Sequence, residues 1–167
     1  MNRVLVLGWG NPSRGDDALG PRLLERLEGE AAARPEWRAH GFVTDFQLAP
    51  EHALDFEGVQ QVLFVDASSL AQAPFAFTRV EASHDRSFTT HALSPQALLA
   101  VRADLGGTVP PAWQLAVRGL RFGLGDPMTD AASAHLEAAV RFAAGLLSNA
   151  DPAAWDGLAT PAVACTN

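Results

Sequence analysis

Short runs of apolar residues alternate with amphipathic stretches along most of this 167-residue chain. The apolar run at 4–8 and the apolar run inside residues 61–66 are typical of strands that are buried on both faces of a parallel sheet. Residues 75–80 alternate between apolar and polar, which indicates an edge strand. Residues 113–122 predict a further strand, and the weaker pattern at 37–43 predicts a fifth.

Helical signals separate these strands. Leu19, Leu23, Leu24 and Leu27 recur at helical spacing after the first apolar run. Ser94 and Pro95 form a typical helix start, and the final helix extends to Ser148. A short helix is also expected at 50–56. Strands that alternate with helices predict an α/β fold, with three α/β/α layers around a mostly parallel twisted sheet of about five strands.

The composition changes after Ser148, where small residues, proline and aspartate replace most large apolar side chains. A chain of this length suits one domain with a substantial core. We therefore predict a single α/β domain over residues 1–149 and a loosely ordered C-terminal tail over residues 150–167.

Charge and composition exclude several classes of partner. The chain carries 12 basic residues, all arginine, against 19 acidic residues, for a net charge of −7. The arginines are scattered, so a nucleic-acid partner is not expected. Apolar runs fall well short of the roughly 20 residues that span a bilayer, and the first is too short for a signal peptide. We therefore expect a cytoplasmic protein with no membrane association, and its single cysteine, Cys165, excludes an internal disulfide.

The first apolar run ends at glycines and is followed by two adjacent carboxylates, Asp16 and Asp17. Asp66 follows the other buried run, and His91 lies in a polar loop before the Ser94 cap. If the preceding strands are parallel, Asp17, Asp66 and His91 meet at one sheet edge, where they suit a borderline divalent ion.

Each of these residues also has a structural interpretation. Asp16 and Asp17 suit the start of a helix, Asp66 suits a strand-end turn, and His91 suits an ordinary loop. His84 is an alternative to His91, although a solvent-exposed role fits it better. The other histidines, His40, His52 and His135, are predicted on the surface.

Other catalytic motifs are absent from the sequence. It has no G-x-S-x-G elbow, no H-E-x-x-H helix and no G-x-x-x-x-G-K-[ST] loop. Gly8 and Gly10 begin a dinucleotide fingerprint, but Ser13 occupies the position of its third glycine. No tightly bound organic cofactor is therefore expected.

The run from Gly8 to Gly20 resembles the opening motif of the [NiFe]-hydrogenase maturation endopeptidases. Three later features are similar to that family: Asp66 after an apolar strand, His91 before Ser94-Pro95, and the turn at 123–129. The resemblance covers about residues 3–147. Two positions depart from the pattern of that family. Asp17 stands where its members often have glutamate, and Asp126 stands where they more usually have glutamate. Residues 45–51, with their Gln-Leu-Ala-Pro-Glu run, look like the branch that serves soluble NAD-reducing-type hydrogenases.

The resemblance implies an aspartyl-type, metal-dependent peptide hydrolase that removes the C-terminal extension of a nickel-loaded hydrogenase large-subunit precursor. Nickel would be supplied by the precursor as the recognition element and contacted by Asp17, Asp66 and His91. Asp16 and Asp17 are the candidate catalytic residues, and Gly10, Asn11 and Gln47 the candidate substrate contacts.

We expect a monomer whose macromolecular partner is the precursor. A nickel-checking chaperone without proteolytic activity is the main alternative. A small-molecule hydrolase, a nucleotide-binding enzyme and an inactive paralogue with the same architecture remain open.

Overall fold

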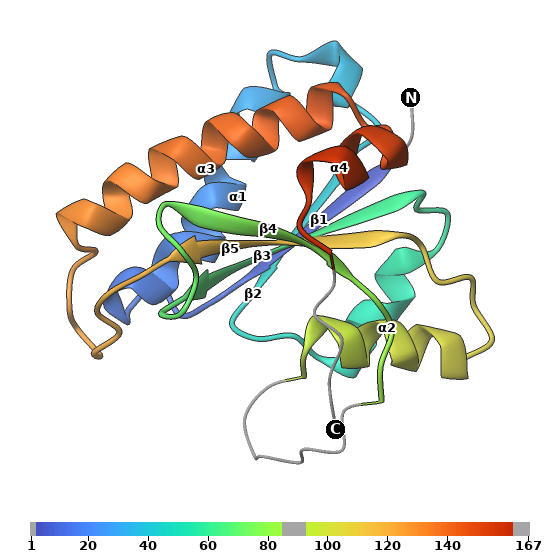
Figure 1. Cartoon of the computed structure of the whole chain (residues 1–167), viewed down its shortest axis with the longest axis horizontal. Helices are drawn as coiled ribbons and strands as arrows, with labels where there is room; N and C mark the ends of the chain where they lie inside the picture. The colour runs from blue at the N-terminus through green and yellow to red at the C-terminus, as the bar shows by residue number, and fades with distance from the viewer. Residues whose placement is uncertain (1–2, 85–92, 162–167) are drawn as a thin grey trace.

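Five strands form one sheet in the order β2-β1-β3-β5-β4 (Figure 1). The computed structural model describes residues 3–84 and 93–161. Four strands are mutually parallel: β1 (Val4–Trp9), β2 (Gly41–Asp45), β3 (Gln61–Ser68) and β5 (Ala112–Arg118). The edge strand β4 (Phe75–Val80) pairs antiparallel with β5. The sheet is therefore mostly parallel, as predicted.

Helices cover both faces of this sheet (Figure 1). One face carries α1 (Leu19–Ala31), α3 (Asp130–Ser148) and α4 (Pro152–Leu158). The other carries the 3₁₀ helix η3 (Pro50–Phe56) and α2 (Pro95–Asp104). Two short 3₁₀ helices, η1 (Gly15–Ala18) and η2 (Pro35–Trp37), complete the set in the described ranges. The predicted three-layer α/β/α architecture is confirmed.

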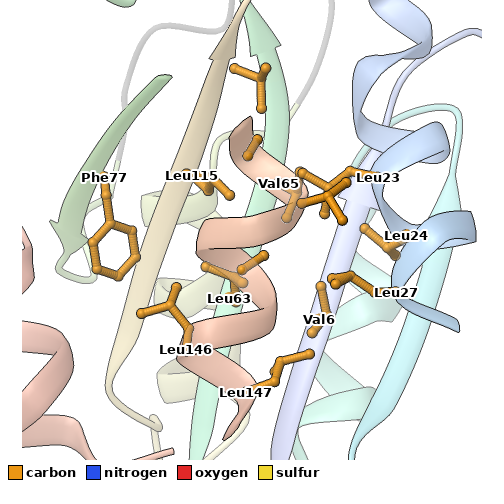
Figure 2. Packing of buried hydrophobic residues seen from close by; sticks show 14 of the residues in the cluster. Val6, Leu23, Leu24, Leu27, Leu63, Val65, Phe77, Leu115, Leu146 and Leu147 are labelled. Atoms are coloured by element: carbon orange, nitrogen blue, oxygen red, sulfur yellow. The ribbon is translucent and has the colours of Figure 1, made fainter. Parts of the chain in front are cut away.

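Alternation along the buried strands supplies both halves of the core. Val4 and Val6 of β1 pack in the cluster under α1 and α3, whereas Leu5 and Leu7 pack in the cluster under η3 and α2. Figure 2 shows side chains of α1 meeting Val6 and side chains of β3 and α3 in the first cluster. Each fully buried leucine or valine contributes about 1.5–3 kcal/mol through the apolar surface that it removes from water.

The prediction of a loose tail from residue 150 is wrong for residues 150–161. Trp155 of α4 is fully buried, with its ring centroid 4.9 Å from that of Trp113. Its indole N–H donates to the carbonyl oxygen of Leu146 at 3.1 Å, and Thr160 then pairs with Thr78 beside β4. One tryptophan thus anchors a segment that has few other large apolar residues. Residues 162–167 lie outside the described residues.

Two predicted strands have different bounds in the structure. The strand expected at 37–43 is β2 at Gly41–Asp45, because residues 35–37 form η2 and bury Trp37. The strand expected at 113–122 ends at Arg118, where the chain turns into a loop that contacts Asp16. Across the described ranges, we find no helix with the length and apolar character needed to cross a membrane.

Candidate functional site at the carboxyl edge of the sheet

The four parallel strands end at the same edge of the sheet, where ligands bind in folds of this type. The loop after β1 carries Asp16 and Asp17, and the last part of β3 carries Asp66. Because β1 and β3 are direct neighbours, this topology brings the three acids to one end of the molecule.

Asp16 is fully buried, and its carboxylate accepts four hydrogen bonds. Its Oδ2 accepts from the backbone N–H groups of Leu120 and Arg121, at 2.7 and 3.0 Å, and from the hydroxyl of Thr129 at 2.9 Å. Its Oδ1 accepts from the N–H of Thr129 at 2.7 Å. Burial alone would raise the pKa of Asp16, but these donors outweigh burial and lower it.

This arrangement makes Asp16 the anchor between the loop after β1 and the loop after β5. Gly15 lies at φ +56°, and a side-chain carbon at that position would approach the carbonyl oxygen of Arg121 to 2.5 Å. The backbone N–H of Asp16 also donates to this oxygen at 2.8 Å. With its oxygens already occupied by donors, Asp16 fits a structural position better than the catalytic role predicted for it.

Asp17 has a different environment from its neighbour. It is only partly buried, and its Oδ2 accepts one hydrogen bond, from the N–H of Asn11 at 2.6 Å. Gly10 makes this position possible, because a side-chain carbon there would lie 2.0 Å from the backbone oxygen of Asp17. Gly10 also adopts φ +149°, a conformation that other residues rarely adopt. The turn therefore holds the Asp17 carboxylate at the strand tip with coordination capacity to spare.

Asp66 lies inside β3 rather than after it, opposite Ala116 of β5. Burial raises the pKa of Asp66 to about 7, with a further upward contribution from the charge of Asp17 and an opposing one from the N–H of Ala67. The two carboxylates are therefore close enough to repel each other. Strand alternation places the Asp66 side chain on the face that η3 and α2 cover.

His91, the third predicted member of this cluster, lies outside the described residues. The condition stated for this cluster, that all three preceding strands run parallel, is not met, because β4 is antiparallel and ends at the opposite edge of the sheet. The helix that follows the His91 segment, α2, nevertheless packs on the same face as the side chain of Asp66. No group of three or more histidine, cysteine or acidic side chains is arranged to hold a metal ion within residues 3–84 and 93–161.

The sequence analysis missed a polar pair beside this site, Asp45 and His52. Nδ1 of the buried His52 accepts the N–H of Ala49 at 2.9 Å, so the ring proton resides on Nε2 and faces Oδ2 of Asp45 at 3.2 Å. The backbone oxygen of Asp45 accepts the N–H of Gly10 at 3.1 Å. A signal was present in the sequence, since Asp45 closes a strand at the same edge as Asp66.

Gln47, predicted to contact substrate, is exposed in the loop after β2. Asn11 is partly buried, and its Oδ1 accepts the N–H of Ser13 at 2.9 Å, closing a turn next to Asp17. Gly10, Asn11 and Gln47 thus all lie in loops at this one edge, with Gly10 and Asn11 shaping the turn under Asp17.

The histidines predicted on the surface are mostly not there. His40 is buried between the N–H of Val4 and the carbonyl oxygen of Leu147, each at 3.2 Å, and burial lowers its pKa. His52 is buried as described, and His135 is partly buried, with Nδ1 2.8 Å from the oxygen of Arg118. His84 is exposed, as predicted. The buried imidazoles satisfy backbone groups where neighbouring elements meet.

Several solved structures share this fold. HycI from Thermococcus kodakarensis, a [NiFe] hydrogenase maturation protease, has a TM-score of 0.66 and 20% identity over 89% of this chain and 94% of that one. HybD from E. coli, a hydrogenase maturating endopeptidase, has a TM-score of 0.66 and 23% identity over 88% and 93%. HybD from T. kodakarensis, another [NiFe] hydrogenase maturation protease, has a TM-score of 0.61 and 18% identity over 87% and 99%.

No family model matches the chain, and no curated protein matches it. The similarity of fold extends over nearly the whole length of these solved proteins. At these identities it is the fold that is shared, and the fold expected from the sequence resemblance is confirmed.

Proposed function

We propose that this protein is an endopeptidase that removes the C-terminal extension from the precursor of a [NiFe]-hydrogenase large subunit. We further propose that nickel carried by the precursor is the recognition element. The fold shared with proteins described as hydrogenase maturation proteases supports the general role. The observation that carries the proposal is the proximity of Asp17 and Asp66 at adjacent strand ends.

Two close carboxylates with few donors around them are unfavourable unless a cation or a proton separates them. Burial raises the pKa of Asp66, and repulsion from Asp17 raises it further. A metal ion in the docked precursor would relieve it by accepting an oxygen from each acid. Soft thiolate ligands of the precursor would select nickel, and the harder oxygen ligands from this protein would complete its coordination. In this proposal His91 supplies a third contact.

The proposed chemistry is hydrolysis of one peptide bond held next to these acids. Docking brings the scissile carbonyl close to the carboxylates, which supplies proximity. Asp17 accepts a proton as a water oxygen adds to the carbonyl carbon, and the proton then passes to the amine nitrogen as the C–N bond breaks. We assign the base to Asp17 and not to Asp16, because Asp16 is fully buried and both of its oxygens already accept hydrogen bonds.

Cleavage of purified precursor tests the proposal directly. Nickel-loaded and nickel-free precursors are incubated with the protein, and the mass of each precursor is followed over time. We expect loss of the extension from the nickel-loaded form alone. Asp17→Asn should abolish cleavage, whereas Asp55→Asn, the same change at an exposed acid in η3, should leave it unchanged.

The outcomes separate the proposal from its alternatives. Equal cleavage of both precursors would contradict nickel recognition while leaving the peptidase activity standing. Tight binding of the nickel-loaded precursor with no change in its mass would support the chaperone alternative. If the protein neither bound nor cleaved either precursor, the proposed role would be refuted.

A further inference from the structure

Exposed apolar side chains gather at the carboxyl edge of the sheet. Phe46 follows β2, Leu70 follows β3, and Leu120 and Leu124 follow β5. Their exposed fractions are 67%, 92%, 54% and 71%. Single exposed apolar residues are ordinary, but several at one edge indicate an interaction site.

Three of these residues lie on the two sides of the acids, and Leu70 follows the strand that carries Asp66. The strand order β2-β1-β3-β5 places Phe46 on one flank and Leu120 and Leu124 on the other, with Asp17 and Asp66 between them. Adjacent strands lie about 4.8 Å apart, so the flanks are about 14 Å apart. A surface of this width suits the face of a folded protein better than one extended peptide.

Two arginines add positive charge to the same edge. Arg14 and Arg121 are both exposed, and neither forms an ion pair with any residue in the described ranges. Their loops are locked together, since the N–H of Gly125 donates to the oxygen of Ser13 at 2.7 Å. On a chain with a net charge of −7, these two unpaired guanidinium groups are suited to carboxylates of a partner.

We propose that these six residues, which we term the rim, are the docking surface for the folded body of the precursor. The rim comprises Arg14, Phe46, Leu70, Leu120, Arg121 and Leu124. The inference rests on the proposed function, because a precursor whose scissile bond reaches Asp17 and Asp66 must also touch what surrounds them. The matching face of the precursor is apolar around its metal centre and carries carboxylates opposite the two arginines. Closure of the rim on that face excludes bulk water from the acids and leaves the single water that the hydrolysis consumes.

Binding measurements with matched leucine variants test the rim. An Asp17→Asn background prevents turnover, and binding of the nickel-loaded precursor is measured by titration. Leu70→Ser combined with Leu124→Ser should weaken binding at least tenfold. The controls Leu54→Ser, Leu105→Ser and Leu158→Ser alter leucines that are 65%, 61% and 60% exposed on other elements, and they should change binding less than twofold.

The charge component has its own variant. Arg14→Glu combined with Arg121→Glu should weaken binding about a hundredfold and reverse its dependence on salt, because salt then screens a repulsion. In the wild-type protein, single rim variants should raise KM and leave kcat within about twofold, because the acids are unchanged.

Three results would overturn the rim. If the rim variants and the control variants bound the precursor with equal affinity, the rim leucines would not be contacts. If rim variants lost affinity only when the C-terminal extension is present, the occupant would be the extension. If the wild type self-associated and rim variants were monomeric, the occupant would be a second copy. If the wild type cleaved the precursor and the rim variants bound it as tightly as the controls, only the rim proposal would be refuted. If the rim variants bound the precursor more weakly but the wild type did not cleave it, only the peptidase proposal would be refuted.

Discussion

Asp16 and Asp17 are neighbours in the chain, yet they lie in opposite kinds of environment. Asp16 is buried and accepts four hydrogen bonds, which lower its pKa. The Asp17–Asp66 pair has few donors, and there burial and mutual repulsion raise the pKa of Asp66 to about 7. The comparison shows that burial alone does not decide whether a carboxylate is charged, because the donors supplied by the surrounding backbone do.

The difference divides the edge of the sheet into an anchor and a proposed reactive centre. The anchor consists of Asp16, Gly15 and the loop after β5, and it fixes the loop that carries Asp17. The centre consists of Asp17 and Asp66, where unrelieved repulsion favours a cation from outside. A stable anchor is what allows a destabilised pair to persist beside it.

Replacing the anchor should produce the largest loss of stability. Asp16→Asn keeps the shape of the side chain but removes its charge and turns an amide N–H₂ toward backbone donors. We expect the free energy of unfolding to fall by about 3–5 kcal/mol, because buried charged hydrogen bonds are lost and donors are left unpaired. Urea unfolding followed by circular dichroism measures this loss.

Asp17→Asn is the matched control for that experiment. Its carboxylate is partly exposed and accepts one hydrogen bond, so a change below about 1 kcal/mol is expected, with cleavage lost. Equal destabilisation by the two substitutions would erase the distinction between anchor and centre.

The second prediction is a pH dependence of opposite sign at the two acids. The pKa of Asp66 is raised in the folded protein from 3.8 to about 7, so the folded state binds the extra proton and stability falls as pH rises between these values. Asp66→Asn should therefore become more stable than the wild type by about 4 kcal/mol at pH 8, and nearly equal to it at pH 4. Urea unfolding across this range measures the difference.

Asp16 provides the contrast in the same series. Its pKa is lowered, so its contribution to stability is complete above 3.8 and is lost as the pH falls below that value. The difference between the wild type and Asp16→Asn should then shrink only in acid. A difference that stayed constant across the whole pH range for both variants would contradict the assignment of both acids.

The apolar pattern predicted the sheet, its helices and the edge position of β4, because continuous and alternating apolar runs report burial locally. It did not predict that β4 runs antiparallel, since strand direction depends on the connection and leaves no mark on periodicity. It also missed α4, where Trp155 supplies most of the apolar surface in a segment of small residues.

The site was predictable in its position but not in its division of roles. Strand ends marked Asp16, Asp17 and Asp66, since each follows or ends an apolar run. The donors that distinguish Asp16 lie 104 to 113 residues further along the chain, so no local pattern reveals them. The pairing of His52 with Asp45 was missed for a related reason, because the burial of His52 depends on how η3 packs beside β2.

The third prediction concerns the turn that presents Asp17 to the edge. Gly10→Ala places a carbon 2.0 Å from the backbone oxygen of Asp17 at φ +149°, so the turn must shift. We expect a loss of about 2 kcal/mol in stability and a large loss of kcat, because the acid moves away from Asp66. Gly29→Ala is the control, since its added carbon meets nothing within 4 Å. Cleavage at saturating precursor, alongside urea unfolding, measures both effects, and normal kcat would show that the turn does not position the acid.

The smallest effect is expected at Asn11, whose side chain closes the turn while its backbone N–H holds Asp17. Asn11→Ala removes the acceptor for Ser13 and should lower stability by about 1 kcal/mol, because one partly exposed hydrogen bond is lost. Asn11→Asp keeps that acceptor and should restore stability, but it adds a negative charge beside Asp17. If the side chain serves only the turn, KM for the precursor should change little in Asn11→Ala. If it contacts the substrate, as the resemblance implies, KM should rise in both variants whatever the stability does, and kinetic titration of the two variants decides between these roles.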